Sequence, residues 1–182
     1  MSFSVMLRIA VWLLLLGGGF AAGRLLDEHW FEQLWSDPVW HLISALLGGM
    51  LLWLVLWASR NTGRTLGRNG REGDLPRLET NRLVTTGIYS CMRHPMHFGL
   101  LFLPLSLALI IGSPGFMFIV APLEMLLMIL MIASLEEAEV KRKFGDAYLS
   151  YRQRVPAFTL KPACLKLLFS NQEGSKPEQD HV

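Results

Sequence analysis

The sequence predicts an all-α integral membrane protein with about four transmembrane helices. Its 182 residues are 52% hydrophobic and only 18% charged, whereas about a quarter of the residues in a soluble domain are charged. The apolar residues gather into four runs, at about 5–26, 39–58, 95–111 and 116–135. Since about 20 apolar residues in a helix cross a bilayer, each run is a candidate span. A net charge of +2 does not indicate a nucleic-acid partner.

The first run is interpreted as a membrane span rather than a cleavable signal peptide. It is longer than the apolar core of a typical signal, and no clear small-residue cleavage site follows it. Gly17, Gly18 and Gly19 lie within this run. Because glycine has no side chain, they would allow a neighbouring helix to approach closely.

Charges between the runs predict how the chain is oriented. The loop from Asp27 to Pro38 holds acids and no Lys or Arg, whereas residues 60–93 hold seven arginines against three acids. Positive charge in short loops stays on the cytoplasmic side, so the acidic loop is predicted outside and residues 60–93 inside. The basic residues after Leu135 are likewise predicted inside. Both termini are therefore expected in the cytoplasm, which is the inner side of the inner membrane if the protein is bacterial.

The last two runs are predicted to form a tight helical hairpin, because only residues 112–115 separate them. Pro95 is expected at the first position of a helix that continues through Ile111, since proline there loses no hydrogen bond. At 17 residues this third run is short for a span. Residues 60–86, before the hairpin, show no helical or strand period.

The open end of the hairpin brings polar side chains to one face. Arg93 and His94 precede the third run, and a helix N-terminus at this point is suited to an anion. The alternative is that both merely anchor a helix at the lipid headgroups. Glu136 and Glu137 follow the fourth run, and carboxylates beside cations could bind a zwitterion. A metal site that joins His94 and His97 to these two acids is the less favoured interpretation, and no metal is predicted.

Residues 136–166 are predicted to form a cap that begins with a cytoplasmic amphipathic helix. The apolar stripe of this helix contains Glu136, Val140, Phe144 and Tyr148 at i,i+4 spacing, and Ala147 and Tyr151 widen it. Glu137 lies beside the stripe. Glu139 is expected in solvent. The helix should end before Pro156, and a short interfacial helix is expected over 161–169. The predicted single domain covers residues 1–166, and 167–182 form a polar tail.

Three further residues are singled out by their type. Cys91 and Cys164 match no disulfide or zinc spacing. Glu124 lies near the middle of the fourth run, and an acid inside a membrane is a functional-site candidate by default. The alternative for Glu124 is a protonated acid hydrogen-bonded across helices, helped by the carbonyl groups that Pro122 leaves unpaired.

Three motifs resemble the integral-membrane methyltransferases of the isoprenylcysteine carboxyl methyltransferase and phospholipid methyltransferase group. The first is LVTTGIYSCMRHPMHFG, which is similar to the pattern G-x-Y-x-x-x-R-H-P-x-Y-x-G. The second is the glutamate pair in EEAEVKRKFGDAYLSY, and the third is YRQRVP. They cover about residues 83–162 in the right order. The chain departs from the family pattern at His97, where tyrosine is usual, and at Ile132, where arginine is usual.

The resemblance implies a methyltransferase that binds S-adenosylmethionine at the cytoplasmic end of the last two helices. It implies a lipophilic or small-molecule methyl acceptor that reaches the site from the bilayer. The implied catalytic residues are Arg154, Glu136 and Glu137. The implied cofactor-binding residues are Tyr89, Arg93, His94, Pro95, His97, Gly99, Glu136, Glu137, Tyr148 and Tyr151.

Two other functions stay open on the sequence. The ending in Val155-Pro156 also resembles membrane sterol reductases, which use NADPH, although this chain is far shorter than those enzymes. A non-catalytic membrane scaffold that kept the fold is the other alternative. Retention of the arginine, the histidine and both glutamates argues against a scaffold.

Overall fold

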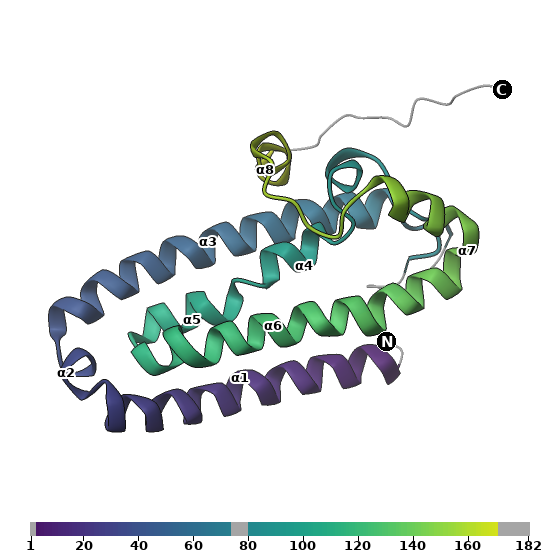
Figure 1. Ribbon diagram of the computed structural model, residues 1–182. Helices are drawn as coiled ribbons and strands as arrows, with labels where there is room; N and C mark the ends of the chain where they lie inside the picture. Colours follow the sequence, from purple (N-terminus) through teal and green to yellow (C-terminus); the bar gives the residue numbers. More distant parts are fainter. Residues whose placement is uncertain (1–2, 74–79, 171–182) are drawn as a thin grey trace. The chain divides into compact units, whose positions relative to one another are not determined.

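A computed structural model describes residues 3–73 and 80–170, and these residues form helices and no strands (Figure 1). The all-α prediction is therefore confirmed. The α-helices are α1 (Phe3–Trp30), α2 (Glu32–Trp35), α3 (Pro38–Asn69), α4 (Pro95–Leu100), α5 (Leu103–Ile111), α6 (Ala121–Met131), α7 (Glu137–Arg154) and α8 (Pro162–Phe169). A 3-10 turn, η1, covers Gly87–Ser90, and π-helical turns cover Phe116–Val120 (η2) and Ile132–Glu136 (η3).

Three helical segments are long and apolar enough to cross a membrane. They are Ala10–Trp30, Pro38–Asn69 and Phe116–Arg154, and Pro95–Ile111 is a shorter apolar segment. The chain is therefore an integral membrane protein. The third predicted run is shorter than the bilayer is thick, because 17 residues in a helix span only about 25 Å. The predicted count of four spans stays a prediction.

One expectation about local structure was wrong. The helix from Pro95 does not continue to Ile111, because α4 ends at Leu100 and α5 begins at Leu103. Pro104 explains the break, since it has no N–H to donate and its ring crowds the carbonyl group one turn earlier. The polar segment after residue 60, whose structure the sequence left open, is helical as far as Asn69. Extending an existing helix costs little, so α3 needs no apolar period to continue.

The chain divides into two compact units, and each is described by itself. The first unit contains Met1–Val55 and Leu101–Leu135, and the second contains Leu56–Leu100 and Glu136–Val182. The predicted organisation as one domain stays a prediction. All the residues implied in catalysis or cofactor binding belong to the second unit.

In the first unit, α1 packs closely against the turn η2 (Figure 1). A Cβ atom at Gly19 would lie 3.1 Å from the side chain of Val120, and one at Gly23 would lie 2.7 Å from the Cβ of Phe116. Gly17 and Gly18 have no atoms within 4 Å of such a Cβ position. The close approach expected of the glycine run is therefore made by Gly19 together with Gly23, one helical turn apart.

The turn between α5 and η2 is held by a buried carboxylate of α1. Gly112 ends α5 with a φ of 75°, a left-handed conformation that glycine adopts without strain. Asp27 accepts hydrogen bonds from the Ser113 hydroxyl at 2.5 Å and from the Gly115 amide at 2.7 Å. The Phe116 amide in turn donates to the Ser113 hydroxyl at 3.1 Å. Asp27 and Ser113 together thus satisfy the first amides of the returning helix, those of Gly115 and Phe116.

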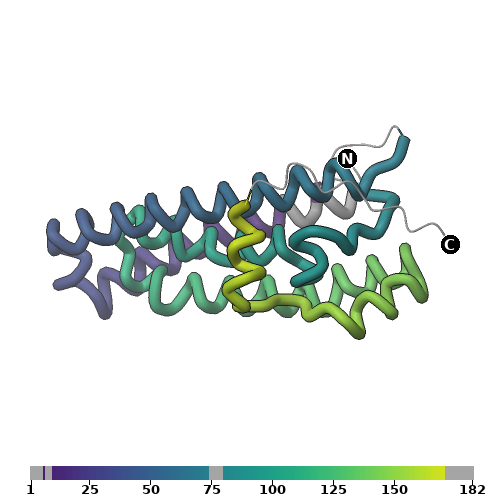
Figure 2. The backbone as a smooth tube through the Cα atoms, turned by 90° about the horizontal axis from the view of Figure 1, so that it is seen from above, coloured from purple at the N-terminus to yellow at the C-terminus, as the bar shows by residue number. Residues whose placement is uncertain are grey.

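In the second unit, a disulfide joins Cys91 to Cys164, although their spacing in the sequence matched no disulfide pattern. Their Cα atoms are 5.7 Å apart although 73 positions separate them in the sequence. Tertiary packing creates this pair, which is why spacing alone did not indicate it. The tube in Figure 2 shows the yellow helix α8 reaching α3, where Trp57 Nε1 donates to the Phe169 carbonyl at 3.1 Å.

Reduction of this disulfide is expected to lower the free energy of unfolding by about 4 kcal/mol, because it releases a closed loop of 73 residues in the unfolded chain. Chemical unfolding in detergent, with and without dithiothreitol, measures the change. Cys164→Ser should show the lower stability in both buffers and no response to the reductant. An unchanged midpoint for the reduced wild-type protein would contradict this expectation.

Candidate active site

The centre of the candidate site is an ion pair between Arg93 and Glu137. The Arg93 guanidinium donates two hydrogen bonds to one Glu137 oxygen, and the Nε bond is 3.0 Å long. Arg93 also donates to the backbone carbonyls of Arg152 and Val155. Arg152 lies 3.3 Å from the second Glu137 oxygen. The side chains of Arg93 and Glu137 are both less than a tenth exposed. Their hydrogen bonds link the chain before α4 to helix α7 and to the segment that follows α7.

His94 is buried beside the same carboxylate. Its Nε2 lies 3.3 Å from Glu137, and burial is the main cause that lowers the pKa of the imidazole. A neutral ring with its proton on Nε2 donates to Glu137. The backbone amides of Arg93 and His94 donate to the carbonyls of Pro156 and Ala157 at 3.0 and 3.2 Å. The donors expected to bind an anion before α4 are therefore used within the chain.

His97 and Glu136 are the more accessible pair of the site. Their nearest atoms are 3.6 Å apart, and their side chains are 25% and 22% exposed. With His94 they bring one potential ligand atom each to within 4.8 Å of one another. Two imidazoles and a carboxylate can hold a metal ion. The expectation of no metal stays a prediction.

The order of burial of the two glutamates is the reverse of the expected one. Glu137 is buried, Glu136 is partly exposed, and Glu139 is exposed as predicted. The apolar stripe assumed an unbroken helix, but Gly145 within α7 has a φ of 54° and a ψ of −130°. This kink separates the helix phase of the glutamates from that of Tyr148. Ala147, which was expected on the stripe, is exposed.

The three tyrosines of the predicted set are buried. The Tyr151 hydroxyl donates to the backbone carbonyl of Tyr89, which ties α7 to η1. Tyr148 packs with Tyr151 and Val155, with Leu83 and Phe144 against them. The Tyr148 hydroxyl is buried, and the charged groups that face it are Glu137 and Arg93.

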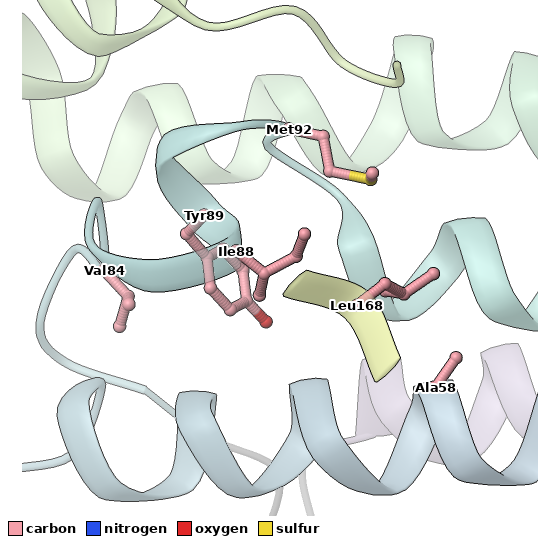
Figure 3. Close-up of a cluster of buried hydrophobic side chains, with 6 residues drawn as sticks. All are labelled: Ala58, Val84, Ile88, Tyr89, Met92 and Leu168. Carbon is pink, nitrogen blue, oxygen red and sulfur yellow. The ribbon is translucent and has the colours of Figure 1, made fainter. Parts of the chain in front are cut away.

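Tyr89 belongs to an apolar cluster that supports the site (Figure 3). The cluster contains Ala58, Val84, Ile88, Tyr89, Met92 and Leu168. Figure 3 shows Ala58 on α3, Leu168 on α8, and Ile88 and Tyr89 on η1, with Leu168 between Ile88 and Ala58. The segment that leads to Arg93 is thus fixed by packing on two helices.

Two other predicted residues have structural roles, and a third lies apart. Pro95 is buried at the first position of α4, as expected. A Cβ at Gly99 would lie 3.2 Å from the Cβ of Ala58, so glycine allows α4 to pack on α3. Arg154 is exposed at the end of α7, and its Nε donates to the Ser150 carbonyl in its own helix. The structure does not bring Arg154 into contact with Arg93 or the glutamates.

Sequence reasoning missed one aromatic residue of the site. The ring of Phe158 lies 6.2 Å from that of His94 and 6.1 Å from that of Phe98, measured between centroids. It follows Pro156, in the segment whose carbonyls accept the amides of Arg93 and His94. An aromatic residue just beyond a motif was the only available signal, and by itself it is weak.

Comparison with protein families gives one match. A family model of phospholipid methyltransferases matches residues 43–147, which is more than half of the chain. The chain belongs to the phospholipid methyltransferase family. No curated protein and no solved structure matches it.

Membership in this family implies a methyltransferase embedded in the membrane. The matched range includes the segment from Tyr89 to Gly99 and both glutamates. It ends just before Tyr148, so the assignment of Tyr148, Tyr151 and Arg154 to the site rests on the motif resemblance alone.

Proposed function

We propose that the chain transfers a methyl group from S-adenosylmethionine to a lipophilic or membrane-associated acceptor. The observation that carries the proposal is the polar cluster in the second unit, in which Glu137 is neutralised by Arg93 and Arg152. Glu136 and His97 remain partly exposed beside this cluster. The phospholipid methyltransferase family supplies the reaction class, since its members act on membrane lipids.

The residues present fit this methyl donor. The amino-acid end of S-adenosylmethionine carries an ammonium and a carboxylate. The ammonium needs a hydrogen-bond acceptor, and the carboxylate needs a cation or an N–H group. Glu136 would accept a hydrogen bond from the ammonium, and a ring N–H of His97 would donate to the carboxylate of the methyl donor. Arg93, His94 and Glu137 would hold these side chains in place.

The bound donor would supply a methyl group carried on a sulfonium, and the sulfur is already activated to leave as a neutral thioether. The chain then has to align donor and acceptor and exclude water. Glu136 is the carboxylate suited to take a proton from an amine or thiol acceptor, because it is partly exposed. Arg154, exposed at the end of α7, would orient a polar group of the acceptor.

The proposed orientation has both termini and the site on the cytoplasmic side. The excess of arginine over acid in residues 60–93 supports it. Disulfides are rare in reducing compartments. On this orientation the Cys91–Cys164 bond would be a redox-responsive link rather than a permanent one.

Calorimetric titration of S-adenosylmethionine into detergent-purified protein tests the proposal. Glu136→Gln should weaken donor binding roughly tenfold or more, because it removes a charged hydrogen-bond acceptor. Glu139→Gln is the matched control, since it makes the same change at an exposed position of α7 and should bind as the wild type does. Arg154→Ala should alter acceptor turnover more than donor binding.

NADPH serves as the control ligand. Binding of NADPH without binding of the methyl donor would overturn the proposal in favour of a reductase. Folded protein that binds neither compound would instead support the scaffold alternative.

A further inference from the structure

Glu124 of α6 is a buried acid that the proposed methyl transfer does not use. It lies in the first unit, within the apolar segment that starts at Phe116, and only 5% of its surface is exposed. Its Oε2 atom is buried without a hydrogen-bond partner in the described part of the chain. A buried polar atom without a partner costs free energy, so its retention needs an explanation.

The structural alternative for Glu124 predicted a hydrogen bond across helices. Pro122 leaves a carbonyl group unpaired one turn earlier, and that group was the expected acceptor. The structure has no hydrogen bond from Glu124 to a carbonyl among the described residues. The Oε2 atom is therefore left unsatisfied by the part of the chain that the structure describes.

Glu124 lies at the wall of an apolar groove between α1 and α6. The groove has a volume of about 260 Å³. Its aliphatic lining is formed by Leu14, Leu15, Ala22, Val120, Leu123 and Leu127. Gly18 and Gly19 also line it, and a Cβ at Gly19 would lie 2.5 Å from Oε1 of Glu124. Gly19 therefore makes room for the carboxyl group.

We propose that this groove binds the hydroxyl end of a long-chain alcohol or other hydroxyl-bearing lipid. A carboxyl group in a membrane is less costly in its neutral form, in which it offers one donor and one acceptor. A hydroxyl group offers the same pair and can satisfy both. An ammonium would require an ion pair whose two charges must both be desolvated.

The size of the groove sets how much of the lipid it holds. Pockets that enclose a whole drug-sized ligand have volumes of about 300–1,000 Å³. The groove is smaller, so it would take the hydroxyl and the first carbon atoms, while the tail stays among the bilayer lipids. Leu14 and Leu123 are more than half exposed and continue the apolar surface along which the tail would lie.

Photolabelling of the wild-type protein in nanodiscs tests the proposal. The probe is hexadecanol that carries a diazirine near its hydroxyl end, and mass spectrometry identifies the labelled peptides. Label on the segments around Leu15 and Leu123, reduced at least fivefold by excess unlabelled hexadecanol, is the expected result. Equal competition by hexadecane would overturn the proposal, since it would indicate ordinary lipid contact. Stronger competition by hexadecylamine would overturn the choice of a hydroxyl.

A pair of glycine variants adds a matched control. Gly18→Leu places a side chain in the groove, and Gly17→Leu makes the same change one residue away, outside the lining. Neither added Cβ meets an atom within 4 Å, so both variants should fold. Label should fall at least fivefold in Gly18→Leu and stay unchanged in Gly17→Leu. Equal labelling of the two variants would contradict a site in this groove.

Substitution of the acid itself identifies the group that selects the hydroxyl. Glu124→Gln keeps a donor and an acceptor and should retain the preference for hexadecanol over hexadecane. Glu124→Leu removes both and should abolish that preference. A preference that survives in Glu124→Leu would overturn the role of the carboxyl group. The proposal does not depend on the methyl-transfer proposal, because all these readouts are independent of the methyl donor.

Discussion

Glu137→Gln is expected to lower the free energy of unfolding by about 3 to 5 kcal/mol, the usual effect of removing one partner of a buried ion pair. Glu137 accepts two hydrogen bonds from Arg93 and pairs with Arg152 through its other oxygen. Glutamine keeps the shape of the side chain but removes the charge. It also turns an N–H group toward one of the guanidinium groups.

The effect on stability follows because Arg93 cannot turn to water. Its guanidinium also donates to the carbonyls of Arg152 and Val155, so in Glu137→Gln a buried cation would remain without its counter-ion. Arg93→Lys should be destabilising as well. A lysine ammonium cannot reproduce the planar set of donors that serves a carboxylate and two carbonyls together.

Chemical unfolding in detergent, followed by far-UV circular dichroism, measures the loss. Glu139→Gln is the control, because it makes the same change on the same helix at an exposed position and should shift the free energy by less than about 0.5 kcal/mol. Equal stability of the two variants would show that the buried pair does not hold the site together.

The helices could be predicted because their causes are local. Long apolar runs need a membrane or a core, and three of them correspond to segments that can span a bilayer. Proline marks two boundaries, since α4 begins at Pro95 and α7 ends at Arg154, two residues before Pro156. The break before Leu103 was missed because the apolar run continues through it, and only Pro104 indicated it.

The types of residue in the site could be predicted, but their separate roles could not. Arg93 and His94 looked available to an anion, yet their amides and the guanidinium bind carbonyl groups that lie about 60 positions later. Long-range pairs of this kind depend on packing. The burial of Glu137 rather than Glu136 was likewise missed, because a helical period read along the sequence assumes neither the π-helical turn that ends at Glu136 nor the kink at Gly145.

Gly48→Val is expected to destabilise the first unit by about 3 kcal/mol, the upper part of the usual range for overpacking. A Cβ at Gly48 would lie 2.6 Å from the backbone nitrogen of Ile110 and 2.8 Å from the Cβ of Leu109. Backbone atoms cannot move aside as a flexible side chain can. α3 and α5 would therefore have to separate, which would expose or empty the contact between them.

Gly49→Val is the matched variant, because the two glycines are neighbours in the middle of α3. A Cβ at Gly49 meets no atom within 4 Å. Both substitutions change helix propensity alike, so the difference between them isolates the contact with α5. Thermal unfolding in detergent should give Gly49→Val a midpoint close to that of the wild type and Gly48→Val a midpoint several degrees lower. Equal midpoints would mean that the close approach of α3 and α5 at Gly48 does not contribute to stability.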